Sequence, residues 1–198
     1  TQIDVAFEIV ESPIPELVGA HAVIWTTTPW TIPVNQALAY GPDVEYALVR
    51  VGAVQVSGPA SALNPPDPMP FPWIGGNKFI VAKELLESFK SRLNGCATQG
   101  AAVEHPGSTV DYLLTIEREI KGSDLAGTTA RHPMHHLGGF FAKPRPFLPG
   151  DFVTTDSGTG LVHMAPDHGE DDFDLCKAHG IDPVFAVEGD GKYRADWA

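Results

Sequence analysis

The chain has 198 residues and a formal net charge of -12 at neutral pH, with 13 Lys and Arg against 25 Asp and Glu. A domain that gripped a nucleic-acid duplex through its phosphates would be basic, so the charge argues against that role and leaves contact with a single-stranded end open. The 20 Gly and 18 Pro favour short strands joined by many turns, in a single domain over residues 1–198.

Apolar residues at alternating positions, bounded by turn-forming residues, predict strands along most of the chain. The expected strands cover residues 3–10, 22–27, 46–51, 54–56, 78–82, 110–120, 152–154, 161–164 and 184–187. We expect segment 54–56 to pair with segment 46–51. Helical spacing predicts a short helix over 31–38, one over 83–93 that Gly95 ends, and one over 170–178 that Gly180 ends.

Other features bound the class of protein. Residues 59–76 form a Pro- and Gly-rich stretch with little charge, which predicts an ordered surface loop. Segment 17–42 lacks charged side chains, but its threonines, Asn35 and three prolines argue against a membrane span. Cys96 and Cys176 match no zinc spacing, and reduced thiols in a cytoplasmic protein are the simplest expectation. The missing initial Met indicates a piece of a longer chain.

A Thr-rich stretch stands out at residues 25–31, where four threonines and two tryptophans fall within seven residues. An apolar run leads into it and Pro29 closes it, so the threonines are expected at the end of a strand. Four hydroxyls would need partners in a core, which favours the mouth of a pocket. The alternative is a Thr-rich edge strand that Pro29 stops.

A second informative stretch covers residues 158–173. It predicts a glycine turn, a strand, a loop and the start of a helix, where the helix dipole and free N–H groups favour charged carboxylates on Asp171 and Asp172. His163 at the strand end can orient water or shuttle a proton. The alternative makes the acidic residues ordinary helix-start solvation and His163 a satisfied core side chain.

Neither stretch matches a common metal, nucleotide or serine-hydrolase motif. A metal site of His163, His168 and Asp172 is conceivable, but HExxH, CxxC and EF-hand patterns are absent. GxSxG and a Walker A loop are absent too, and residues 158–160 lack the third glycine of a dinucleotide site. Three other histidines lack further ligands at useful spacing and predict a surface loop: His132, His135 and His136.

Together the two stretches resemble the editing domain of isoleucyl-tRNA synthetase. The matching motifs are WTTTPWTIPVNQAL at residues 25–38 and GTGLVHMAPDHGEDDF at residues 158–173. The related leucine and valine enzymes typically read TTRP in the first motif, whereas Thr28 precedes Pro29 here, which points to the isoleucine enzyme. The HIGH and KMSKS motifs of the synthetic domain are absent, as expected for an excised editing domain.

The resemblance implies a mainly β fold, with a β-barrel-like core and peripheral α-helices. The implied activity is hydrolytic editing of valine wrongly attached to tRNA(Ile), with valyl-adenylate as a second candidate substrate. A pocket for isoleucine cannot exclude valine, because one methylene is worth only about 1–3 kcal/mol, and this enzyme is the standard example of that limit. The implied partners are the 3′ acceptor end of the tRNA and the rest of the parent synthetase, with no membrane and no cofactor in this domain.

The resemblance also implies residue roles. Asp172 matches the aspartate that holds the α-ammonium group of the substrate, and His163 matches the histidine near the amino-acid side chain and ester. Thr27 and Thr28 are expected to bond the ester carbonyl, the terminal ribose or the attacking water. The other implied site residues are Trp25 and Thr26 in the wall, Asn35 in a less defined role, Gly158, Thr159 and Gly160 near the terminal adenosine, and His168 and Asp171 as supports.

Two other functions stay open from the residues alone. One is a catalytically silent module that binds the tRNA acceptor end, and the other is a metal-dependent hydrolase, which a chelator would test. No covalent nucleophile is assigned, because threonine hydroxyls are weak nucleophiles without an adjacent base.

Overall fold

The computed structural model describes residues 2–58, 77–104 and 106–197. The strands of this part are β1 (Ile3–Glu11), β2 (His21–Thr26), β3 (Ala37–Tyr40), β4 (Glu45–Ser57), β5 (Lys78–Ala82), β6 (Thr109–Lys121), β7 (Thr129–Arg131), β8 (Pro144–Pro149) and β9 (Leu161–Met164). Its α-helices are α1 (Leu86–Glu104) and α2 (Glu170–Ala178). The mainly β fold expected from the sequence is confirmed. The loop expected over residues 59–76 lies outside the described residues.

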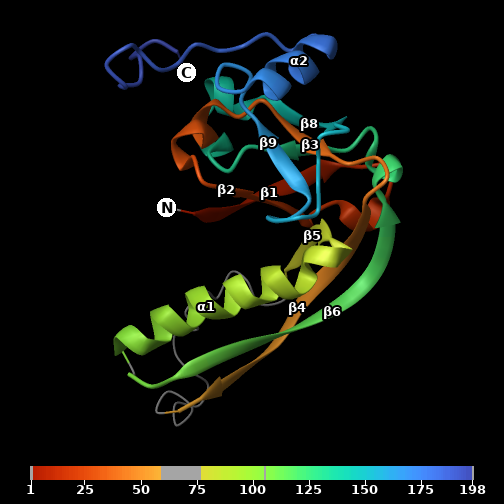
Figure 1. Cartoon of the computed structure of the whole chain (residues 1–198), viewed down its shortest axis with the longest axis vertical. Helices are drawn as coiled ribbons and strands as arrows, with labels where there is room; N and C mark the ends of the chain where they lie inside the picture. Colours follow the sequence, from red (N-terminus) through yellow and green to blue (C-terminus); the bar gives the residue numbers. More distant parts are fainter. Residues whose placement is uncertain (1, 59–76, 105, 198) are drawn as a thin grey trace.

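The nine described strands form one mixed sheet in the order β6-β4-β5-β2-β1-β7-β8-β3-β9. The pairs β2–β5 and β3–β8 run parallel, and the other neighbouring pairs run antiparallel. The sheet curls on itself, because β9 at one end of the order comes back against β2 in its middle (Figure 1). This closure produces the barrel-like core, and it brings the segment that follows β2 beside β9.

Buried apolar side chains from β1 to β5 fill the curled sheet. The innermost are Phe7, Ile24, Leu38, Leu48 and Ile80, each at most 1% exposed. Burying a side chain of this size contributes about 1.5–3 kcal/mol, so this cluster is the main source of stability for the strands that carry the site. A smaller cluster, which includes Met164 of β9 and Cys176 of α2, packs α2 beside β9.

Strands β4 and β6 extend beyond the curled part as a long antiparallel ribbon, on which α1 lies (Figure 1). Phe79 of β5, Phe89 of α1 and Tyr112 of β6 fill the interface, each at most 3% exposed. The Tyr112 N–H also donates to Asn94 Oδ1 of the helix at 2.9 Å. The ribbon and the helix therefore pack on each other as an extension of the curled sheet.

The helix expected over residues 83–93 begins and ends elsewhere. A 3-10 turn covers Lys83–Leu85, and α1 runs from Leu86 to Glu104, straight through Gly95, where the prediction placed its end. Glycine favours a helix end, but this local preference is weak. Here Thr98 Oγ1, one turn beyond Gly95, accepts the Val110 N–H of β6 at 2.9 Å, and tertiary packing overrides the local signal.

Two predictions on the first half of the chain were wrong in detail. The helix expected over 31–38 is a 3-10 turn at Pro29–Val34 followed by strand β3, whose four residues are all buried and therefore do not alternate. Segments 46–51 and 54–56 are one strand, β4, and both pair with β6 instead of with each other. A register shift between Val51 and Val54 interrupts the alternation that the prediction relied on.

The predicted strands in the second half of the chain were also partly wrong. Residues 152–154 are not a strand, because Phe152 lies in a turn and the next two residues have no regular structure. The strand in this region is β8, earlier in the chain, and its three prolines are unfavourable in a strand. Strand β7 was not predicted. In place of the strand expected over 184–187 there is one bridge, between Val187 and Tyr193.

His132 does not lie in a surface loop, as the sequence suggested, but is fully buried. Its Nδ1 accepts the Met134 N–H at 3.0 Å, so Nε2 carries the hydrogen and donates it to Ile32 O at 2.9 Å. Burial lowers the pKa of His132 to about 4. His135 is partly exposed and His136 is exposed, so the surface prediction holds for the second of these.

No helix in the described part of the chain is both long enough and apolar enough to cross a membrane.

Candidate functional site

The closure of the sheet places the end of β2, the end of β9 and the start of α2 around one cleft of about 310 Å³. Its lining includes seven residues that the sequence singled out: Trp25, Thr26, Thr27, Thr28, His163, His168 and Asp172. It also includes residues to which no role was assigned: Trp30, Thr31, Val162, Ala165 and Gly169. Trp30 and Thr31 stand inside the Thr-rich motif, so the motif itself was the signal for them.

The Thr-rich stretch is a tight turn that its own hydroxyls hold together. Thr26 Oγ1 accepts the Thr28 N–H at 3.1 Å and lies 3.2 Å from Thr28 Oγ1. The Thr31 hydroxyl donates to Thr28 O at 2.8 Å. Thr26 and Thr31 are thereby satisfied and buried, whereas Thr27 and Thr28 are exposed at the cleft. The alternative of a plain edge strand does not describe this turn.

His163 lies opposite Leu38 in the β9–β3 pair and is buried, at 8% exposure. Its Nε2 is 3.1 Å from Thr31 Oγ1. Because the single hydrogen of that hydroxyl goes to Thr28 O, Nε2 must carry the hydrogen and donate it to Thr31. Burial, with a smaller effect of nearby His168, lowers the pKa of His163 to about 4. The ring is therefore neutral near pH 7.

Asp172 stands in the first turn of α2, where its Oδ2 accepts the Ala165 N–H at 2.7 Å. The sequence led us to expect that the helix start favours the charged form. Burial outweighs the Ala165 bond, however, and the repulsion of Asp171 adds to it, so the pKa of Asp172 is raised. A carboxylate short of compensating charge at a cleft is suited to receive a cation.

His168 and Trp30 form the outer edge of the cleft. Their rings meet edge-on with centroids 4.8 Å apart, and Trp30 is 50% exposed. The Tyr193 hydroxyl donates to Trp30 O and anchors this turn to the C-terminal segment. His168 Nε2 is buried and lies 3.9 Å from Asp167 Oδ2, which is too long for a hydrogen bond.

The other residues singled out by the sequence lie outside the cleft lining. Asn35 is fully buried, and its Nδ2 donates to Ala37 O at 2.8 Å. Asp171 is exposed on the neighbouring face of α2. The glycine turn 158–160 packs behind Trp25, and Thr159 within it is 1% exposed. The roles of these residues in binding substrate stay predictions.

Among residues 2–58, 77–104 and 106–197, no group of three or more His, Cys, Asp and Glu side chains is arranged to hold a metal ion. Cys96 and Cys176 are free thiols, the first exposed and the second buried. His163 and His168 both line the cleft together with Asp172, but one nitrogen of His163 is already committed to Thr31.

The low pKa of His163 makes stability depend on pH. The unfolded chain binds a proton at this side chain below about pH 6.5, whereas the folded chain does so only near pH 4, so stability falls as pH drops through this window. At pH 4.5 we expect His163 to cost about 2–3 kcal/mol of unfolding free energy relative to pH 7.5. Urea unfolding at both pH values measures this.

The matched variant is His163→Gln, which keeps a polar group but does not titrate. Its unfolding free energy should fall less than that of the wild type between pH 7.5 and 4.5. Buried His132 also lowers the unfolding free energy at low pH, but its effect is the same in both proteins and cancels in the comparison. Equal losses in the two proteins would contradict a neutral, desolvated His163.

The chain is similar in sequence to isoleucine–tRNA ligases of several bacteria. It is 50% identical over 197 residues to an isoleucine–tRNA ligase of Zymomonas mobilis and 42% identical over 199 residues to that of Gluconobacter oxydans, covering 100% of this chain in each case. A third relative, the isoleucine–tRNA ligase of Pelagibacter ubique, is 36% identical over 188 residues, or 95% of this chain. The chain spans only 17% of the length of each. No family model matches the sequence.

Solved structures show the fold. The editing domain of the cytosolic leucyl-tRNA synthetase of Plasmodium falciparum superposes with a TM-score of 0.50 at 15% identity, over 81% of this chain and 48% of that one. A version of it with two insertions deleted gives the same TM-score at 13% identity, over 81% and 47%. Along its whole length the chain is therefore homologous to a segment of isoleucine–tRNA ligases, and it has the fold of a tRNA-synthetase editing domain.

Proposed function

We propose that this chain hydrolyses the ester that joins valine to tRNA(Ile), with valyl-adenylate as a second substrate. The observation that carries the proposal is the convergence of Thr27 and Thr28, His163 and Asp172 on one cleft of about 310 Å³. The homology to isoleucine–tRNA ligases supports the choice of tRNA.

Asp172 receives the α-ammonium group of the amino acid in this proposal. The bond from the Ala165 N–H at 2.7 Å orients the carboxylate through Oδ2, so Oδ1 is the oxygen available to the substrate. Gly169 packs against it, since a side chain there would come within 3.0 Å of Oδ1. Burial disfavours the ionised form of Asp172, and the positive charge of a bound ammonium group compensates for this effect.

Thr27 and Thr28 bind the ester or the attacking water in this proposal. Both are exposed at the cleft, and Thr26 fixes the backbone and the hydroxyl position of Thr28. A hydroxyl held in this way can donate to the ester carbonyl or orient the attacking water without reorganising during the reaction. No covalent intermediate is needed, and a hydroxyl of the terminal ribose is a suitable group to assist the water.

His163 serves as a wall of the pocket. It is neutral near pH 7, its Nε2–H is bound to Thr31, and its Nδ1 is buried without a hydrogen-bond partner among the described residues. Neither nitrogen is placed to take a proton from water in the cleft. We therefore assign His163 to size selection beside the amino-acid side chain, and leave the positioning of water to the threonines.

Selection by size explains why a second site is useful. A synthetic pocket that accepts isoleucine gains only about 1–3 kcal/mol against valine, whereas a smaller hydrolytic pocket excludes isoleucine by steric clash. The acidic charge of -12 fits a domain that meets only the flexible acceptor end, while other parts of a parent synthetase hold the tRNA body.

The test is hydrolysis of valyl-tRNA(Ile) and isoleucyl-tRNA(Ile) by the 198-residue chain, with and without a chelator. The expected result is chelator-resistant loss of valine with isoleucine retained. Loss that stops with chelator would indicate a metal-dependent hydrolase. No loss of either, here and within a full-length ligase that carries this segment, would indicate a silent binding module and overturn the proposal.

A further inference from the structure

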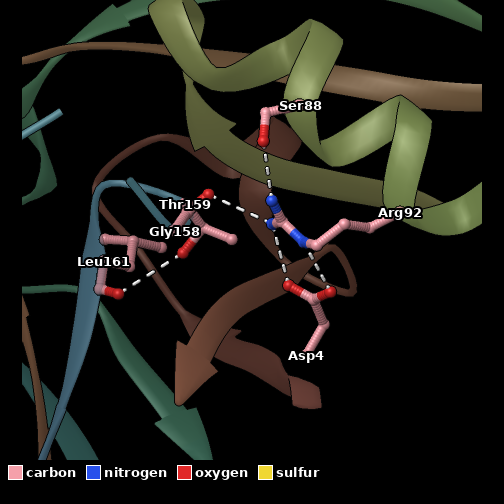
Figure 2. Close-up of polar contacts among 6 residues, drawn as sticks. All are labelled: Asp4, Ser88, Arg92, Gly158, Thr159 and Leu161. Atoms are coloured by element: carbon pink, nitrogen blue, oxygen red, sulfur yellow. Dashed lines mark hydrogen bonds and ion pairs between the residues drawn. The ribbon is translucent and has the colours of Figure 1, made fainter. Parts of the chain in front are cut away.

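Arg92 joins three parts of the chain that are far apart in the sequence. It lies in the second turn of α1 and forms a two-pronged ion pair with Asp4 of β1, with Nε 2.8 Å from Oδ2 and Nη2 2.9 Å from Oδ1. Nη2 also donates to Gly158 O at 3.1 Å, and Nη1 donates to Ser88 Oγ at 2.9 Å. Figure 2 shows the guanidinium between Asp4 and the glycine turn.

Two of the three partners of Arg92, Asp4 and Gly158, adjoin Trp25, which lines the candidate cleft. Asp4 is the cross-strand neighbour of Trp25 in the β1–β2 pair, so their side chains lie on the same face of the sheet. Gly158 lies behind Trp25, because a side chain at Gly158 would come within 3.5 Å of the indole ring. Arg92 thus holds the strand on one side of Trp25 and the turn on the other.

Arg92 bonds the glycine turn at Gly158, the first residue of the turn. Gly158 and Gly160 adopt the left-handed conformation, with φ of 81° and 75°, which glycine enters at low cost and also leaves easily. The middle of the turn is bonded to β5, because Thr159 O accepts the Ala82 N–H at 2.7 Å. The Gly158 carbonyl oxygen accepts its hydrogen bond from the charged guanidinium of Arg92, and such charge-assisted bonds are stronger than neutral ones.

We propose that Arg92 is a positioning residue that sets the width of the cleft by holding Gly158 against Trp25, and so contributes to discrimination between valine and isoleucine esters. The proposal rests on the hydrolytic function proposed above. A two-pronged ion pair that is only about one quarter exposed can also stabilise the fold, so the test uses a ratio of rates that loss of folded protein leaves unchanged.

The experiment compares Arg92→Met with Arg92→Lys and the wild type in the 198-residue chain, and again in a full-length ligase that carries this segment. Methionine keeps an apolar stem but removes every donor, whereas lysine keeps the positive charge and an N–H donor but loses the two-pronged geometry. The readout is the ratio of kcat/KM for valyl-tRNA(Ile) to that for isoleucyl-tRNA(Ile). Loss of folded protein lowers both rates equally and leaves this ratio unchanged.

The matched control is Arg118→Met, which breaks an ion pair of 2.8 Å with Glu16 away from the cleft lining. We expect the ratio to fall by about tenfold in Arg92→Met, because a wider cleft relieves part of the steric clash that excludes isoleucine. The ratio in Arg92→Lys should lie between those of Arg92→Met and the wild type, and Arg118→Met should keep the full ratio.

The outcomes separate this inference from the proposed function. If the wild type hydrolyses neither ester, the proposed function fails. If the wild type is selective but the ratio in Arg92→Met is unchanged, or falls equally in Arg118→Met, the function stands and the role of Arg92 is overturned.

Discussion

Replacing Asp172 by Ala is expected to lower kcat/KM for valyl-tRNA(Ile) hydrolysis by about a hundredfold or more. Removing one partner of a buried, hydrogen-bonded charge pair costs about 2–5 kcal/mol, and each 1.4 kcal/mol is about tenfold. In the proposed complex the removed partner is the Asp172 carboxylate, whose pKa is raised by burial, and the α-ammonium group is left without its receptor. Single-turnover deacylation assays at several enzyme concentrations measure the effect.

Asp171→Ala is the matched control for this variant. The two carboxylates are adjacent in the first turn of α2, but Asp171 is exposed and does not line the cleft. Asp171→Ala should therefore stay within about threefold of the wild type, since an exposed charge is screened by solvent. Asp172→Asn adds a second comparison, because an amide oxygen can still accept the Ala165 N–H but carries no charge.

Folding is not expected to fail in Asp172→Ala. Burial raises the pKa of Asp172, so the ionised carboxylate is disfavoured in the fold and its removal relieves that cost. The lost acceptor for the Ala165 N–H acts in the opposite direction, by about 1–3 kcal/mol at most. Wild-type deacylation in a folded Asp172→Ala protein would rule out the ammonium assignment.

The sequence predicts best where one local signal decides the structure. The glycine turn, strand β9 and helix α2 follow one another within residues 158–178, each with its own boundary signal. The structure confirms the strand and the helix with their expected bounds. The same contiguity brought His163 and Asp172 to one cleft. They are separated by a single loop, so little had to be known of the rest of the chain.

The predictions that failed depend on contacts between distant segments. Nothing near Gly95 reveals that Thr98 will bond a strand, and the prolines of β8 conceal a strand that pairs in parallel with β3. The raised pKa of Asp172 has the same origin, because the dipole of α2 is visible in the sequence but the burial is not. Asn35 belongs to the first motif, yet the packing of β3 places it in the interior.

Close packing restricts position 160 of the glycine turn, and Gly160→Ala is expected to lower the unfolding free energy by about 2–5 kcal/mol. A side-chain carbon at position 160 would come within 2.4 Å of Ala82 Cβ on β5. Overpacking of this kind costs about 1–3 kcal/mol, and the left-handed backbone, with φ of 75°, adds about 1–2 kcal/mol. Urea unfolding at neutral pH measures the total.

Gly180→Ala separates the two costs. Gly180 has nearly the same backbone angle, 72°, but nothing lies within 4 Å of a side-chain carbon there, so only the conformational cost of about 1 kcal/mol is expected. Ala82→Gly in the Gly160→Ala background removes the atom that the new methyl group meets and should restore part of the loss. Equal losses in Gly160→Ala and Gly180→Ala would contradict the clash. If the clash is measured, close packing against β5 suffices to require glycine at position 160, and no contact with a bound adenosine is needed to explain it.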